Sequence, residues 1–260
     1  MKIAITGKGG VGKTTLAGTM ARILAARGMK VLAIDADPDS NLASSIGISK
    51  DRVTGVTPIA EMTRLIEERT GTTKGQFGGV FKINPQVDDI PDQFAISHEG
   101  VKLLILGSIP EGGGGCFCPE STLLKSLLRH LIIKRDEAVI LDMEAGLEHL
   151  GRGSTAGMDA LIVVVEPGQR SIQTAQHIKK LAADLQVKKV FIVGNKIQNE
   201  SDKELIKNGL PEFDVLGYMS FNTAIIQADK EGRAPYDLDE RIKEEVEEVL
   251  KNLEKKRVER

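Results

Sequence analysis

Short apolar runs alternate along the chain with stretches whose apolar positions recur at helical spacing. The apolar runs predict buried strands over Lys2–Thr6, Val31–Asp35, Val101–Leu106, Ala138–Asp142, Leu161–Val165 and Val190–Val193, with a weaker strand near Val215. The periodic stretches predict helices over Thr14–Arg27, Ser121–Ile132, Ser171–Leu185 and Asp202–Asn208. Strands that alternate with helices are typical of a parallel sheet covered on both faces. We therefore expect the α/β fold class, with a mostly parallel sheet flanked by helices on both faces.

Two stretches interrupt this rhythm. Residues 49–97 show a loose pattern, and we expect them to form an insertion over one edge of the sheet rather than a second domain. Residues Glu111–Pro119 form a glycine-rich loop that carries both cysteines. The C-terminal stretch, 238–260, has apolar positions at helical spacing, which predicts a charged helix docked on the body. The chain, 1–260, is thus expected to form a single domain.

Composition narrows the classes of function. The 260 residues include 35 Lys and Arg against 37 Asp and Glu, so bulk charge would not hold the protein on nucleic acid. Aromatic residues make up 3% and Trp is absent, which argues against base-stacking platforms. The longest apolar run, Leu161–Val165, is too short to span a bilayer, and Met1–Thr6 leads into glycines without the pattern of a secretory signal. We expect a cytoplasmic protein with neither a nucleic-acid nor a membrane partner.

A glycine loop follows the first predicted strand and opens the first predicted helix. It reads Gly7-Lys8-Gly9-Gly10-Val11-Gly12-Lys13-Thr14. Glycines let successive backbone N–H groups point at a polyphosphate, and the amino end of the helix adds a positive dipole. In this pattern Lys13 reaches the β and γ phosphates, and the Thr14 hydroxyl ligates Mg²⁺. The loop therefore predicts a P-loop NTPase whose nucleotide is bound by Gly9, Gly10, Val11, Gly12, Lys13, Thr14 and Thr15.

A dinucleotide-binding fold is the rival interpretation of the same residues. Gly7, Gly9 and Gly12 also spell G-x-G-x-x-G after a strand, and Asp35 stands about where a ribose-binding acid is expected. The Lys13-Thr14 pair favours a triphosphate, because a dinucleotide-binding helix has no need for a lysine and a hydroxyl at that point.

Carboxylates follow two of the predicted strands. Asp35, Asp37 and Asp39 stand at the end of the second strand, at the edge where open α/β sheets bind ligands. Asp39 would lie near Mg²⁺ or, equally well, cap a helix. Asp142 ends another strand, and Gly146 follows four residues later. This is the pattern of a switch in which the acid acts on Mg²⁺ and the glycine N–H senses the γ phosphate.

The pair Asn195-Lys196 comes at the end of the strand that begins at Val190. An Asn amide there offers a donor and an acceptor together to the edge of adenine. We expect both residues to contribute to nucleotide binding.

With Lys8 directly after its first glycine, the loop resembles the deviant Walker A family, which includes the Min and Par ATPases and nitrogenase iron protein. The resemblance implies a homodimer that sandwiches ATP, with Lys8 reaching across to the partner's nucleotide. It also implies that Asp37 orients the attacking water, and that Lys8, Lys13, Asp37 and Asp142 form the catalytic set. That family often places a proline-containing segment under the base, whereas the matching stretch here, Met219–Asn222, has none.

The two cysteines, Cys116 and Cys118, stand one residue apart after four glycines. A C-x-C pair offers two soft ligands, while a tetrahedral thiolate site needs four, which a two-fold dimer would supply. A deviant Walker A loop with C-x-C resembles the CooC-type ATPases, which help to insert nickel into carbon monoxide dehydrogenase. The resemblance implies that the dimer binds Ni²⁺ or Zn²⁺ through both pairs and that ATP hydrolysis drives nickel delivery to carbon monoxide dehydrogenase or acetyl-CoA synthase. Glu144 departs from the small residue we expect in that family.

Two other functions stay open from the sequence. Four thiolates could hold an iron–sulfur cluster, as in nitrogenase-type reductases, although the cysteines of those proteins lie far apart in sequence. A partitioning or positioning ATPase would act on DNA or a membrane, and it would want a basic surface or a basic amphipathic tail.

Overall fold

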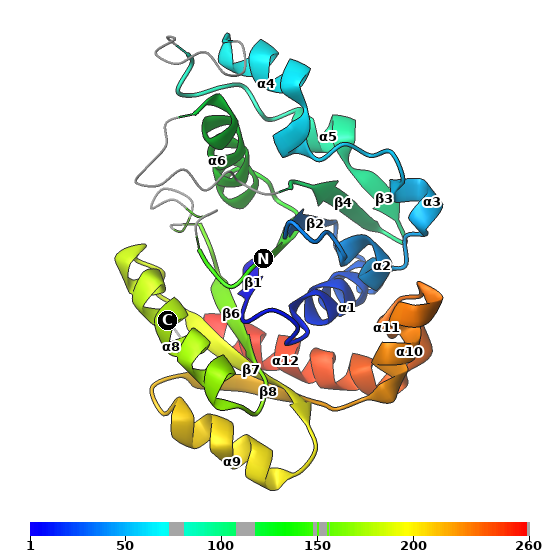
Figure 1. Cartoon of the computed structure of the whole chain (residues 1–260), viewed down its shortest axis with the longest axis vertical. Coiled ribbons are helices and arrows are strands. Elements are labelled where there is room, and N and C mark those ends of the chain that lie inside the picture. The colour runs from blue at the N-terminus through cyan, green and yellow to red at the C-terminus, as the bar shows by residue number, and fades with distance from the viewer. Residues whose placement is uncertain (73–80, 108–117, 148–149, 151–154, 156, 259–260) are drawn as a thin grey trace.

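In the computed structural model, which describes residues 1–72, 81–107, 118–147, 150, 155 and 157–258, eight strands form one sheet in the order β3-β4-β2-β5-β1-β6-β7-β8 (Figure 1). The strands are β1 Lys2–Thr6, β2 Val31–Ala36, β3 Ile96–His98, β4 Val101–Ile105, β5 Ala138–Met143, β6 Ala160–Val165, β7 Val190–Ile197 and β8 Asp214–Ser220. All neighbours are parallel except β3 and β4. The predicted fold class is therefore confirmed.

The helices cover both faces of the sheet. They are α1 Lys13–Ala26, α2 Leu42–Ile46, α3 Lys50–Val53, the 3₁₀ turn η1 Ile59–Glu61, α4 Thr63–Thr70, α5 Ile90–Phe94, α6 Pro119–Ile133, α8 Gln169–Asp184, α9 Glu200–Gly209, α10 Thr223–Glu231, α11 Pro235–Leu238 and α12 Glu240–Val258. Alternate side chains of each strand enter opposite cores, as the pleat requires. Ile3 and Ile5 of β1 pack with α1, α2 and α12, while Ala4 packs with the core that holds α4, α6 and α8.

Strand register brings the predicted acidic residues to one edge of the sheet. In the parallel pairing of β2 with β5, Asp35 lies directly opposite Asp142. Because β1 pairs with β5 on its other side, the glycine loop that follows β1 opens at the same edge. The topology thus gathers the loop and both acidic strand ends at one place, as expected for the carboxyl edge of a parallel sheet.

Several elements differ from the sequence expectations. Strand β3 is antiparallel and was not predicted, nor was helix α10. The C-terminal helix α12 begins at Glu240 rather than near Leu238. The cause is Asp239, whose backbone is extended and whose Oδ1 accepts a hydrogen bond of 2.8 Å from the N–H of Arg241. This is the geometry of a helix N-cap.

The loosely patterned residues 49–97 contain α3, η1, α4, α5 and β3, and Figure 1 shows α3, α4 and α5 at the β3–β4 end of the sheet. The expectation that they form an insertion in a single domain stays a prediction. Among the described residues, no helix combines the length and the apolar character needed to cross a membrane.

Candidate nucleotide site

The glycine loop joins β1 to α1 in a conformation that requires glycine at two points. Gly12 precedes α1 with φ +96°, and a Cβ there would stand 2.1 Å from Nδ2 of Asn195. Gly7 has φ +146°, and a Cβ would stand 2.5 Å from the carbonyl oxygen of Val164. Left-handed backbone and close neighbours both exclude side chains. The tight packing fixes where the amino end of α1 points.

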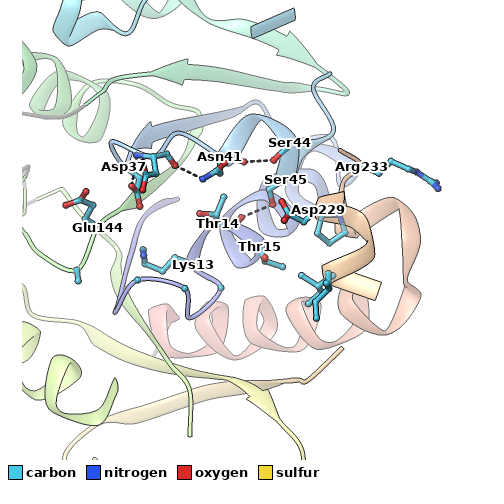
Figure 2. Close-up of a pocket in the computed structure, with 18 residues that line it drawn as sticks. Lys13, Thr14, Thr15, Asp37, Asn41, Ser44, Ser45, Glu144, Asp229 and Arg233 are labelled. Atoms are coloured by element: carbon cyan, nitrogen blue, oxygen red, sulfur yellow. Dashed lines mark hydrogen bonds between the residues drawn. The ribbon is translucent and has the colours of Figure 1, made fainter. Parts of the chain in front are cut away.

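A cavity of about 790 Å³ opens beside this loop (Figure 2). Most of the predicted phosphate-binding residues line it together, and they are Gly9, Gly10, Gly12, Lys13, Thr14 and Thr15. Asp37, Asp39 and Glu144 also line it, and Figure 2 shows Asp37 and Glu144 on the side of Lys13. The cavity thus brings a lysine and the amino end of α1 together with carboxylates, an arrangement suited to a triphosphate with a bound cation.

Asp35 and Asp142 are both completely buried, but their surroundings differ. Asp35 accepts hydrogen bonds from the Ser40 hydroxyl at 2.6 Å, from the N–H of Leu42 at 3.0 Å and from the N–H of Asp37 at 3.3 Å. Burial raises its pKa, and these donors partly offset the effect. Asp35 therefore stabilises the loop after β2 and does not line the cavity. The dinucleotide interpretation needed Asp35 to bind a ribose, so this position argues against it.

Asp142 keeps both carboxylate oxygens buried without a hydrogen-bond partner among the described residues. Burial raises its pKa to about 7; the side chain of Thr14 lowers it somewhat, although no hydrogen bond of ordinary geometry joins the two, and Asp35 raises it further. A buried carboxylate without donors needs a cation or a proton. Asp142 beside Thr14 therefore fits Mg²⁺, which prefers oxygen ligands.

Asp37 is held by the backbone around it. Its N–H donates to Asp35 Oδ1, and its own Oδ1 accepts a hydrogen bond of 3.0 Å from the N–H of Asp39. The side chain lines the cavity.

Lys8 does not line the cavity. Its Nζ lies 3.3 Å from Oε1 of Glu166, while Nζ of Lys196 lies 2.8 Å from Oε2 of the same carboxylate. Burial acts to raise the pKa of Glu166, but the two lysines outweigh it and the pKa is lowered. Glu166, which the sequence reading did not assign to the site, thus holds both predicted lysines within one subunit.

Two residues that were predicted to contact the nucleotide form hydrogen bonds within the protein instead. Asn195 is buried, its Nδ2 donates to the carbonyl of Val11 at 2.7 Å, and its Oδ1 accepts from the N–H of Lys196. In this structure it supports the phosphate loop. The N–H of Gly146 donates to the carbonyl of Glu144 at 2.8 Å, so it faces the turn after β5 rather than the cavity.

The wall opposite the acidic side was missed by the sequence reading. Helix α10, the connection after it and the start of α11 supply Ile225, Ile226, Asp229, Arg233 and Pro235 to the cavity. The available sequence signals were local: Asn222 caps the amino end of α10 by accepting from the N–H of Ala224 at 2.8 Å, and Gly232 ends it with φ +62°. Asn and Gly are the residues expected at those two positions.

Only one of the two cysteines falls in the described residues; Cys116 lies outside them. Cys118 is the N-cap of α6, and its Sγ accepts from the N–H of Ser121 at 3.4 Å. Across the described ranges, no group of three or more His, Cys, Asp or Glu side chains could hold a metal ion. The predicted C-x-C metal site therefore stays a prediction.

Comparison with known proteins agrees with this geometry. The model of the family described as "CobQ/CobB/MinD/ParA nucleotide binding domain" matches residues 2–236. The chain is 50% identical over 238 residues to the carbon monoxide dehydrogenase accessory protein CooC of Rhodospirillum rubrum, covering 92% of this chain and 90% of that one. It is 45% identical over 253 residues to an uncharacterised ATP-binding protein of Methanocaldococcus jannaschii, covering 96% of each.

Solved structures share the fold at lower identity. The MinD cell division protein of Aquifex aeolicus superposes with a TM-score of 0.68 at 20% identity, covering 98% of this chain and 97% of that chain. A putative plasmid partition protein of Borrelia burgdorferi bound to AMPPNP gives a TM-score of 0.68 at 19% identity, covering 98% and 99%. The phosphate loop, the acidic strand ends and the extent of the family match lead to one conclusion: the chain belongs to the CobQ/CobB/MinD/ParA nucleotide-binding family of P-loop ATPases.

Proposed function

We propose that the chain is an ATP-dependent metallochaperone, whose ATP-bound homodimer builds a four-cysteine site and delivers nickel to carbon monoxide dehydrogenase or acetyl-CoA synthase. The observation that carries the proposal is the C-x-C pair in a chain that is 50% identical to a carbon monoxide dehydrogenase accessory protein over 92% of its length. The phosphate loop alone would support any ATPase of the family. The cysteines add a means of binding a metal ion, which the protein would deliver.

The cysteine pair has the right chemistry for a soft cation. Each chain contributes two sulfurs, and a two-fold dimer brings four to one axis, the number that tetrahedral thiolate sites need. Cys118 stands at the amino end of α6, where the helix dipole and the N–H of Ser121 favour negative charge on sulfur. Thiolate is the form that binds Ni²⁺ or Zn²⁺, and we treat that ion as the cargo.

Hydrolysis would depend on side chains that position the attacking water and stabilise the negative charge of the phosphates. Lys13 at the start of α1 stabilises negative charge on the phosphates, and Asp37 orients the attacking water. The oxygens of Asp142, which have no hydrogen-bond partner in the described part of the chain, would hold Mg²⁺ together with Thr14, and Mg²⁺ would neutralise phosphate charge when bound. The partner subunit's Lys8 would complete the site.

Dimer formation would then change a contact seen within one subunit. Lys8 pairs with Glu166 at 3.3 Å, so it must leave that carboxylate to reach a nucleotide on the partner. The phosphates of the partner's ATP would replace the Glu166 carboxylate as the anion that pairs with Lys8, and they form a stronger charge-assisted interaction. This exchange would link ATP binding to the dimer, and through the dimer to the cysteines.

Metal titration of the purified chain, without oxygen, tests the proposal. A hydrolysis-deficient Asp37→Asn variant with Mg²⁺ and ATP should form dimers that bind one Ni²⁺ or Zn²⁺ each. Adding Cys116→Ser and Cys118→Ser should abolish metal binding while ATP affinity stays within about twofold, since Cys118 is not among the described residues that line the nucleotide cavity. A metal stoichiometry unchanged in the double cysteine variant would refute the site.

The Lys8→Ala variant separates ATP binding from assembly. It should bind ATP yet remain monomeric in analytical ultracentrifugation, and it should lack the tight metal site. A chain that stays monomeric with every nucleotide but still binds metal normally contradicts the proposal. A brown protein that contains iron and absorbs visible light would instead favour a reductase. Nickel delivery is measured separately, as the nickel-dependent recovery of activity when the chain is added to metal-free carbon monoxide dehydrogenase.

A further inference from the structure

One carboxylate of the C-terminal helix α12 forms hydrogen bonds with the last residue of strand β8. Glu245 accepts hydrogen bonds from the N–H of Ser220 at 2.9 Å, through Oε2, and from the Ser220 hydroxyl at 2.6 Å, through Oε1. Arg241, one turn earlier, pairs with Glu245 Oε1 at 3.1 Å and donates to the Ser220 hydroxyl at 2.5 Å. The three side chains thus form a closed network around one backbone position.

A second carboxylate holds the next turn of the chain. Asp239 Oδ2 accepts from Nδ2 of Asn222, and its Oδ1 accepts from the N–H of Arg241. The bond from Asn222 lowers the pKa of Asp239. Oδ1 of Asn222 in turn accepts the N–H of Ala224, so this amide joins the start of α12 to the start of α10. We call Glu245 and Asp239 the α12 clamp.

The clamped segment controls the wall of the nucleotide cavity that lies away from the phosphate loop. Helix α10 begins at Thr223, directly after Asn222, and it places Ile225, Ile226 and Asp229 on the cavity. Figure 2 shows Asp229 on the opposite side from Asp37. The N–H of Phe221 also donates to the carbonyl of Ile197 at 2.9 Å, which ties the segment to the end of β7. We call Ile225, Ile226 and Asp229 the α10 wall.

The two ends of the cavity suit the two ends of a nucleotide. The glycine loop offers backbone N–H groups and Lys13 to phosphates. The α10 wall offers apolar surface and one carboxylate, which suit the flat face of a base and a hydroxyl or amino donor. Ile226 is 48% exposed, so about half of its surface is open to a ligand.

We propose that Glu245 and Asp239 are positioning residues that fix the α10 wall for the nucleoside end of ATP. This rests on the assignment of the cavity to ATP. Binding a base against a wall is favourable only when the wall is already in place, because otherwise binding must pay to order it. The stretch Met219–Asn222 has no proline to stiffen it, and the clamp supplies the stiffness from α12. Both acids lie beyond residue 236, where the match to the family model ends.

The test compares ATP with inorganic tripolyphosphate, which has phosphates but no nucleoside. In the Glu245→Gln variant, the amide keeps the size of the side chain but loses the charge and one acceptor. We expect the Kd and KM for ATP to rise about tenfold, the effect of one lost hydrogen bond. The Kd for tripolyphosphate and the kcat should stay within about twofold. Glu244→Gln, an exposed neighbour on the same helix, is the matched control and should behave as wild type.

Two more variants guard against a general loss of structure. Asp239→Asn should act in the same direction as Glu245→Gln, and Ser220→Ala should give a smaller effect that is not additive with Glu245→Gln, since both remove the same contact. Equal weakening of ATP and tripolyphosphate, or an unchanged Kd for ATP, overturns the clamp. If the wild-type chain binds tripolyphosphate but does not prefer ATP, the nucleoside end has no site and the clamp fails as well. A wild-type chain that binds neither ligand overturns the assignment of the cavity to ATP, on which the proposed function rests.

Discussion

Asp142 is the residue at which function and stability are most directly opposed. Its pKa of about 7 means that the folded chain disfavours the charge that the unfolded chain carries freely above its ordinary pKa of 3.8. Without nucleotide, stability should therefore fall as pH rises from about 4 to about 7 and then level off. The difference corresponds to roughly 4 kcal/mol at the upper limit.

The Asp142→Asn variant should remove this slope. Urea unfolding at pH 5 and pH 8 should show the variant more stable than wild type at pH 8, with a smaller difference at pH 5. Its ATPase rate should fall at least about a hundredfold, because an amide is a poor ligand for Mg²⁺. An unchanged pH slope would show that Asp142 is not the buried acid responsible.

Gly12 makes a second prediction at the residue scale. Alanine there would adopt φ +96° and push its Cβ to 2.1 Å from the side chain of Asn195. We expect Gly12→Ala to lose about 1–3 kcal/mol of unfolding free energy in urea and to lose nucleotide binding. Gly9→Ala is the control for stability, because its Cβ would meet no atom of the described residues within 4 Å. Equal stability of the two variants would contradict the steric argument.

At the scale of elements, the far end of α6 is held by a buried lysine on β1. Nζ of Lys2 donates to the carbonyls of Leu131 at 3.2 Å, Arg135 at 2.6 Å and Glu137 at 2.9 Å. The carbonyl of Leu131 lies in the last turn of α6, where carbonyls lack partners within the helix. The same cation also satisfies the carbonyls of Arg135 and Glu137 in the segment that follows the helix.

Lys2→Met should therefore cost about 2–3 kcal/mol of unfolding free energy, the value of hydrogen bonds to a charged group that leave buried acceptors unpaired. Lys102→Met, which breaks an exposed pair with Asp92, should cost less than about 1 kcal/mol. Chemical denaturation of both variants measures the difference. A loss at Lys2 no larger than at Lys102 would mean that water satisfies these carbonyls.

The elements also show where sequence patterns succeed. The central strands β1, β5 and β6 are buried along their whole length, so continuous apolar runs reveal them. Helix α10 buries only Ala228 and therefore has no apolar stripe to detect. Strand β3 has three residues, none fully buried. Periodicity reports burial, and elements with little burial escape it.

Some features of the candidate site could be predicted from the sequence, and others could not. The phosphate loop could be predicted because its residues are consecutive and their conformational demands are local. The pairing of Lys8 with Glu166 joins segments 158 residues apart in sequence, and only the fold brings them together. The amide of Asn195 looked available for a base, but the same fold places it on the phosphate loop. Residue types set the chemistry, and topology decides which partner each one finds.

At the scale of the whole molecule, α12 completes one of the two cores although it lies beyond the family match at residue 236. Five of its apolar side chains are at most 1% exposed, and they are Ile242, Val246, Val249, Leu250 and Leu253. They pack in the same core as Ile5 of β1 and Leu16 of α1. The helix is therefore part of the folding unit as well as the source of the clamp.

These two roles of α12 can be separated by substitution. Leu250→Ala leaves a cavity in the core and should cost about 2–5 kcal/mol of unfolding free energy. Leu205→Ala, at a side chain that is 37% exposed, should cost far less. Because Leu250 takes no part in the hydrogen bonds of the clamp, the affinity of the folded Leu250→Ala variant for ATP should remain within about twofold of wild type, the reverse of the result expected for Glu245→Gln. Calorimetric titration below the melting temperature, paired with urea unfolding, measures both. A Leu250→Ala variant that weakens ATP as much as Glu245→Gln would mean that α12 acts on the cavity through packing of the whole core, and not through its carboxylates.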